Sequence, residues 1–221
     1  MASYSKGLAT KRKFVMSAFK HLESHDERTL TVRMLAAENG YSVAALYKHF
    51  ESLDYLLDVA SVHFLNNYLN SYADLLDGSK SPLQVYMDGW KLFIDCAFEH
   101  PDIFYRIFWR TDRETLEFAF TDYFRIFPSA SPEMNSVQFG ILMSNGDMRE
   151  RDLALLAPLL NTNIITSADA EFLCTTNELI VSGLLWRAVR SDQSDRESLR
   201  DLCHKLIIEN VSRRVRDYDA K

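Results

Sequence analysis

No proline occurs before Pro82, and the apolar residues of this N-terminal part recur at the three- and four-residue spacing of amphipathic helices. Within residues 11–23, for example, Phe14, Ala18 and Leu22 fall on one helical face. Polar and glycine-containing turns interrupt this pattern at short intervals. The N-terminal part of the chain is therefore predicted to form several short helices rather than strands or one long helix.

Capping residues give the expected boundaries of two of these helices. Thr31 is expected to cap a helix over 32–39, and Gly40 is expected to end it in the left-handed conformation. Ser42 follows almost at once and is expected to cap a second helix over 43–50. Two short helices that meet across a tight glycine-containing turn, with a helix on either side, are typical of a helix-turn-helix motif.

The second helix of this motif is predicted to contact DNA. Val43, Leu46 and Phe50 are expected to point into the core. The positions left facing outward are Ala44, Ala45, Tyr47, Lys48 and His49. Small side chains let a helix enter the major groove, where their methyl groups contact thymine methyl groups, and the three larger side chains can donate to phosphate oxygens. Taken singly, these three also fit a half-buried tyrosine, a solvated lysine and a structural histidine.

The whole run resembles a known DNA-binding segment. Its blocks are Leu30-Thr31-Val32-Arg33-Met34-Leu35-Ala36, Gly40-Tyr41-Ser42, Leu46-Tyr47-Lys48-His49-Phe50 and Leu56-Leu57. In identity and spacing they are similar to the helix-turn-helix of TetR-type (TetR/AcrR) bacterial transcriptional regulators, over about residues 10–60. The resemblance implies that Thr31 and Arg33 reach the DNA backbone or a base edge, that Ser42, Ala44 and Ala45 lie over the bases, and that Tyr47 and His49 hold phosphates.

One departure from the family pattern leaves an alternative open. The family often has a lysine at the start of the next helix, where this chain has Leu53 between the acidic Glu51 and Asp54. Lys48 is a candidate to replace that phosphate contact. Alternatively, the chain is a helical interaction or ligand-binding protein that kept the fold but lost DNA binding.

The charge of the chain is unevenly distributed. The formal net charge is -6, but residues 1–55 hold 8 Lys+Arg against 6 Asp+Glu, whereas residues 56–221 hold 17 against 25. Residues 1–22 carry no Asp or Glu, and their positive charges are those of Lys6, Lys11, Arg12, Lys13 and Lys20. A basic end on an acidic body is expected to orient the chain towards an anion, although a solvated basic tail fits the same charges.

Composition argues against several classes of protein. An aromatic content of 12% excludes a chain that is mostly disordered, and no apolar stretch approaches the roughly 20 residues of a membrane span. Cys96, Cys174 and Cys203 are few and far apart, as in a reducing compartment. We therefore expect a cytoplasmic protein with no membrane, metal or cofactor. No glycine-rich phosphate loop or nucleophile elbow occurs, so an enzyme is not expected.

The remainder of the chain is predicted to be a larger helical bundle. Its expected helices cover 82–99, 103–109, 112–126, 132–144, 150–160, 170–190 and 196–216. The middle of the chain is rich in large aromatic residues, and Trp90, Phe93, Phe104 and Phe108 are candidates to line a pocket for a small apolar effector, although an ordinary core is the simpler interpretation for each.

The last two helices are the predicted dimer surface. An apolar stripe on the final helix comprises Leu199, Leu202, Leu206, Val211 and Val215, and Gly183 permits close approach of the preceding helix. The resemblance implies a four-helix interface between two subunits. The complete prediction is an all-α chain with a helix-turn-helix DNA-binding domain over 1–55 and a ligand-sensing and dimerisation domain over 56–221. It would bind a palindromic double-stranded DNA operator as a homodimer and act as a repressor that an unknown effector releases.

Overall fold

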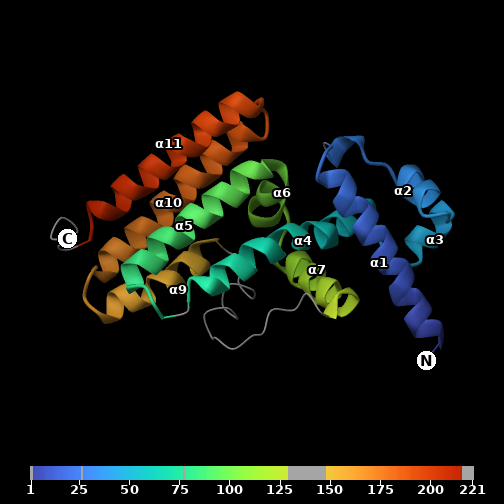
Figure 1. The fold of residues 1–221 in the computed structure, drawn as a ribbon, viewed down its shortest axis with the longest axis horizontal. Helices are drawn as coiled ribbons and strands as arrows, with labels where there is room; N and C mark the ends of the chain where they lie inside the picture. The colour runs from blue at the N-terminus through green and yellow to red at the C-terminus, as the bar shows by residue number, and fades with distance from the viewer. Residues whose placement is uncertain (1, 26, 77, 129–147, 216–221) are drawn as a thin grey trace. The chain divides into compact units, whose positions relative to one another are not determined.

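The computed structural model describes residues 2–25, 27–76, 78–128 and 148–215, and every regular element in these ranges is helical, as predicted (Figure 1). In chain order the elements are α1 (Ala2–Leu22), η1 (Glu27–Thr29), α2 (Val32–Glu38), α3 (Val43–Tyr47), α4 (Leu53–Asp74), α5 (Pro82–Glu99), α6 (Pro101–Tyr105), η2 (Arg106–Arg110), α7 (Arg113–Ile126), α9 (Met148–Asn161), α10 (Ser167–Ala188) and α11 (Gln193–Ser212). None of the helices in these ranges is both long and apolar enough to cross a bilayer.

The chain forms two compact units. The first contains residues 1–67 and 110–133, and the second contains residues 68–109 and 134–221. Helix α4 begins in the first unit and ends in the second. The predicted division at residue 55 separates the chain by function and stays a prediction. The compact units differ from it because they place the first two thirds of α4, together with α7, beside the helix-turn-helix.

Helix α7 is held in the first unit by its contacts with α1 and α4. Asp122 accepts hydrogen bonds from the Lys11 ammonium group and from the Tyr55 hydroxyl, both at 3.1 Å. The Arg12 guanidinium donates to the backbone carbonyl of Ile126 at 2.7 Å. The DNA-binding segment is therefore supported by a helix that is distant from it in sequence.

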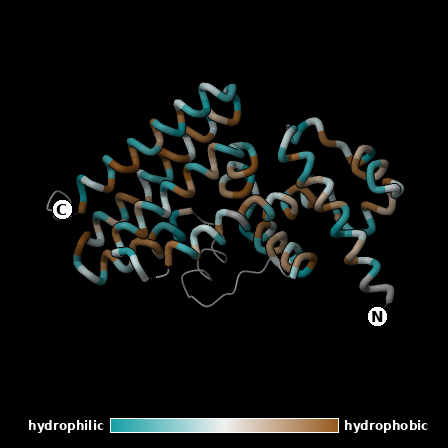
Figure 2. The backbone as a smooth tube through the Cα atoms, viewed as in Figure 1, coloured by the Kyte–Doolittle hydropathy of each residue, from teal (hydrophilic) through white to brown (hydrophobic). Residues whose placement is uncertain are grey.

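The second unit is a bundle in which α11 packs on both α10 and α5, and α10 packs on α9 (Figure 1). Hydrophobic and hydrophilic residues alternate from turn to turn along these helices (Figure 2). The apolar turns supply a core that includes Phe93, Leu173 and Val181, each completely buried. Amphipathic helices that bury one face are the basis of this kind of packing.

Several boundaries differ from the sequence prediction. The helix predicted over 43–50 ends at Tyr47, where residues 48 and 49 form a turn. The aromatic helix predicted over 103–109 is an α-helix followed by the π-helical turn η2. Residues 161–169, predicted to be a loop, include the start of α10, because Thr166 and Asp169 form a capping box there. The helix predicted over 132–144 lies outside the described residues.

Candidate functional site

The turn of the helix-turn-helix is closed by a specific hydrogen-bonding pattern. Gly40 has a φ of +71°, in the left-handed region that favours glycine. Its N–H donates to the carbonyl of Ala37 at 3.1 Å, and the N–H of Tyr41 donates to the carbonyl of Ala36 at 2.8 Å. This pair of bonds is a Schellman motif, which satisfies the last carbonyls of α2 and redirects the chain towards α3.

Both helices of the motif begin with the predicted caps. Thr31 Oγ1 accepts a hydrogen bond from the Met34 N–H at 3.3 Å, and Ser42 Oγ accepts one from the Ala45 N–H at 3.1 Å. Because α3 has only five residues, its cap satisfies a large share of the backbone donors that have no partner within the helix.

Tyr41 anchors the turn to α1. Its hydroxyl lies 3.3 Å from Thr10 Oγ1, and its ring lies 5.4 Å from the ring of Phe14. Leu46 and Phe50 are buried below α3, as predicted. The prediction that Val43 is buried with them is wrong, because 36% of its surface is exposed. Val43 is the first residue of α3, so no preceding helical turn covers its side chain.

The predicted DNA-binding residues lie mostly on the exposed face of the motif. Thr31, Arg33, Ser42, Ala44, Tyr47 and Lys48 are exposed, whereas Ala45 and His49 are half-buried. Sequence reasoning missed two apolar residues on this surface, Met34 at 46% exposure and Val43. The only signal for Met34 was that it precedes Leu35 and Ala36, which are buried on the opposite face of α2.

His49 lies in a positive environment and carries no charge at neutral pH. Burial, together with the nearby Lys11 and Lys48, lowers the pKa of His49 below its usual value. A neutral imidazole can still donate one hydrogen bond. The phosphate contact that the family resemblance implies for His49 is thus a contact between a neutral donor and an anion.

The basic start of the chain is partly occupied by contacts within the protein. Lys11 binds Asp122 and also lies over the ring of Phe50, 5.3 Å from its centroid. The guanidinium of Arg12 binds the end of α7 and lies over the ring of Phe127. These two cations hold α7 on α1, so the charge count over residues 1–22 overstates the charge that is free to meet an anion.

The four candidate pocket residues form one aromatic cluster in the second unit. The ring of Phe93 lies 5.9 Å from Trp90, 5.7 Å from Phe104 and 5.2 Å from Phe108, and the interplanar angles are near perpendicular. Trp90, Phe93 and Phe104 are buried, and Phe108 is half-buried. The structure therefore brings the predicted residues together, and their role in effector binding stays a prediction.

A charged residue that sequence reasoning missed lies within this cluster. Arg151, on α9, exposes only 4% of its surface. Its guanidinium carbon lies 4.6 Å from the ring centroid of Phe93, 5.1 Å from that of Tyr68 and 5.6 Å from that of Phe108. Charged residues on a short helix usually face solvent, so no local pattern signalled this burial.

The neighbouring Asp152 begins a chain of hydrogen bonds through the bundle. It accepts from the Trp90 indole and from the Tyr86 hydroxyl, both at 3.1 Å. Asn177 donates to the Tyr86 oxygen at 3.1 Å, and Asn210 donates to Asn177 Oδ1 at 2.8 Å. Burial raises the pKa of Asp152 to about 6.

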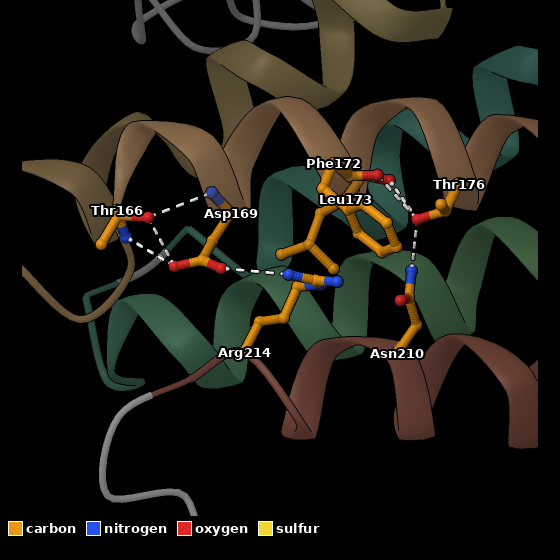
Figure 3. A network of polar contacts seen from close by, with 7 residues as sticks. All are labelled: Thr166, Asp169, Phe172, Leu173, Thr176, Asn210 and Arg214. Carbon is orange, nitrogen blue, oxygen red and sulfur yellow. Dashed lines mark hydrogen bonds and ion pairs between the residues drawn. The ribbon is translucent and has the colours of Figure 1, made fainter.

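The end of this chain joins α11 to α10 (Figure 3). Asn210 also donates to Thr176 Oγ1 at 2.6 Å. Towards the C-terminus, Arg214 donates to Asp169 Oδ1 at 3.2 Å and stacks on the ring of Phe172, 3.4 Å from its centroid (Figure 3). These contacts fix the register of the last two helices.

The outer surface of α10 and α11 carries exposed apolar residues. Phe172, Leu179 and Trp186 recur every seven residues on α10 and are 42%, 65% and 46% exposed. Beside them a groove of about 350 Å³ is lined by Thr176, Leu179, Ile180, Leu206, Glu209, Asn210 and Arg213. The prediction that Leu199, Val211 and Val215 form the dimer surface is wrong, because these side chains are buried within the subunit. Leu202, at 40% exposure, remains available.

Comparisons with known proteins bear on the fold. No family model and no curated protein sequence matches the chain. Among solved structures, it is similar to the crystal structure of a TetR transcription regulator from Haloarcula marismortui ATCC 43049, with a TM-score of 0.56 and 20% sequence identity. The likeness covers 94% of this chain and 100% of that chain. The chain therefore has the fold of a TetR transcription regulator, as its helix-turn-helix sequence predicted.

Proposed function

We propose that the protein is a dimeric, effector-responsive DNA-binding regulator of transcription, and that it acts as a repressor. The observation that carries this proposal is the surface of α3, which presents the small side chain of Ala44 between exposed donors on a rigidly closed turn. A shallow, small-side-chained helix with donors at its edges fits the major groove of DNA.

Each residue on this surface has a role that follows from its chemistry. Ala44 and the half-buried Ala45 lie over the bases, where a methyl group can contact thymine. Tyr47, 51% exposed, and Lys48 donate to phosphates at the groove edge. Arg33, exposed on α2, reaches the DNA backbone or a base edge.

Two copies of α3 are needed for useful specificity, because a five-residue helix reads few bases. Helix-turn-helix proteins meet this need as two-fold dimers whose half-sites lie about 34 Å apart or a multiple of that distance. The seven-residue spacing of Phe172, Leu179 and Trp186 offers α10 as the apolar surface for a second copy.

The acidic residues near α3 favour a different interpretation, in which the protein binds a protein or lipid-like partner instead of DNA. Glu51 and Asp54 are both exposed. Asp54 Oδ1, however, lies 3.4 Å from Arg110 Nη2, which offsets part of its charge. DNA binding remains the better supported proposal, since the position of this arginine reduces the repulsion that a phosphate would meet.

The test is a salt titration of DNA binding by the full-length protein. DNA sites are first selected from a random duplex library, and affinity is then measured by fluorescence anisotropy between 50 and 200 mM salt, a range over which phosphate contacts lower affinity steeply. Replacing Tyr47 or Lys48 by alanine should weaken binding to every sequence, and Lys48→Ala should reduce the slope of log K against log salt by about 0.9. The exposed Lys91 on α5 provides a matched control.

Sequence choice supplies an independent readout. Ala44→Leu should change which sites are selected, because a bulkier side chain fills the space above the bases. Lys91→Ala should leave both affinity and salt slope unchanged. No selected sequence, or a salt slope unaffected by Lys48→Ala, would reject DNA binding through α3 and favour the interaction protein.

A further inference from the structure

The guanidinium of Arg151 is buried without a carboxylate partner. Among the described residues, no Asp or Glu forms an ion pair with it. Its Nη2 donates to the Tyr68 hydroxyl and its Nη1 makes a long contact of 3.7 Å with Met148 Sδ. Its Nε–H is buried with no hydrogen-bond acceptor. A buried charge with an unsatisfied donor is costly unless an anion or an acceptor completes it.

The adjacent Asp152 does not complete it, because both of its carboxylate oxygens are occupied. Oδ1 accepts from the Trp90 indole and Oδ2 accepts from the Tyr86 hydroxyl. Both donors come from α5. Asp152 is therefore turned towards the hydrogen-bond chain of the bundle, whereas Arg151 is stacked among aromatic rings.

A second buried donor without an acceptor borders the same rings. The indole Nε1–H of Trp109 is buried and unsatisfied, and the Trp109 ring lies 5.9 Å from that of Phe108. Phe108 in turn lies beneath the Arg151 guanidinium. Both aromatic residues belong to the π-helical turn η2, and such turns occur frequently at functional sites. Phe108 and Trp109 are only half-buried, so the cluster reaches solvent at this turn.

We propose that Arg151 is the recognition group for a carboxylate on an apolar effector that binds within this aromatic cluster. The inference rests on the proposed effector-responsive function and names the chemical class of its effector. The ligand carboxylate accepts from the Arg151 Nε–H, and the Tyr68 hydroxyl donates to the same group. The rings of Phe93 and Phe108 contact the apolar body. Guanidinium and carboxylate groups match in charge and planar geometry.

The electrostatics of Tyr68 agree with its role as a donor. Tyr68 is only 2% exposed, and burial raises its pKa above the ordinary value. The hydroxyl therefore keeps its proton at neutral pH and can donate it to a ligand while its oxygen accepts from Arg151.

The test compares carboxylic acids with their neutral amides on the full-length protein. Benzoate, phenylacetate and octanoate are each paired with the corresponding amide, and binding is measured by isothermal titration calorimetry. At least one acid should bind tenfold or more tightly than its amide. Arg151→Gln should abolish that preference, and Tyr68→Phe, which removes only the hydroxyl, should reduce it several-fold. Inorganic phosphate, which lacks an apolar body, should not compete.

Folding and DNA binding are measured separately. Circular dichroism and affinity for selected DNA without any acid report whether Arg151→Gln is folded and whether the protein binds DNA at all. If that variant does not fold, Tyr68→Phe decides the outcome. The proposal is overturned if acids and amides bind equally, if none of the acids binds, if inorganic phosphate competes with the acid, or if folded Arg151→Gln or Tyr68→Phe keeps the full preference. A protein that binds the acid but no DNA would overturn the proposed function alone.

Discussion

Asp152 should make the free energy of unfolding fall as the pH rises from about 4 to about 6. Burial raises its pKa from 3.8 to about 6 in the folded chain, whereas the unfolded chain titrates near the ordinary value. Between these values the folded state holds a proton that the unfolded state has released, so folding is favoured at the acidic end. Each pH unit corresponds to about 1.36 kcal/mol, which gives a total loss of about 3 kcal/mol once the pH exceeds both pKa values.

The variant Asp152→Asn isolates this effect. The amide keeps an oxygen that can accept from the Trp90 indole, and it does not ionise. The assay is urea unfolding at one protein concentration from pH 4 to 7, because the stability of a dimer depends on concentration. Carboxyls with lowered pKa values, such as Asp112 and Asp169, lose stability as pH falls. They are present in both proteins and cancel in the difference.

The difference between the two proteins is therefore the quantity that decides. Relative to its value at pH 4, where part of the loss has already occurred, the variant should gain about 2–3 kcal/mol on the parent chain by pH 7. Asp201→Asn, at an exposed carboxyl on α11, should show no such gain. A difference that stays flat across this range, or that has the opposite sign, would refute the burial of an ionisable Asp152 in this hydrogen-bond chain.

Single substitutions at two glycines and one cap test other parts of the structure. Gly89→Ala should destabilise the fold by about 1–3 kcal/mol in urea unfolding, because the added Cβ would lie 2.7 Å from the buried ring of Tyr72. Gly183→Ala, where an added Cβ would meet nothing within 4 Å, should leave unfolding unchanged or improved, yet weaken dimerisation in analytical ultracentrifugation; unchanged dimerisation would remove this part of α10 from the interface. Ser42→Ala should cost about 1 kcal/mol in urea unfolding by loss of the cap, and Ser42→Thr should largely restore it.

The helix-turn-helix could be predicted from sequence because its determinants are local. The caps at Thr31 and Ser42 and the left-handed Gly40 each act within a few residues, and the structure places all three as expected. The early end of α3 could not be predicted, because the apolar spacing of Leu46 and Phe50 fits a helix as well as the observed turn. Both side chains are buried in either conformation.

The parts that were not predicted depend on contacts between distant segments. Lys11 counts in the sequence as a free cation, yet it binds Asp122 over a separation of 111 residues. Arg151 has the sequence context of a solvated residue, and only the tertiary structure places it against Tyr68. Val211 belongs to an apolar stripe that serves a subunit core or a dimer surface equally well, and the decision requires knowing which helices cover it.

The symmetry of the DNA site tests the central claim most directly. Full-length protein is used to select duplexes from a random library, and the mass of the complex is measured by analytical ultracentrifugation. The account predicts a two-fold symmetric site bound by a dimer or a pair of dimers, with half-site centres about 34 Å apart or a multiple of that distance. A monomeric protein that enriches no sequence would contradict it.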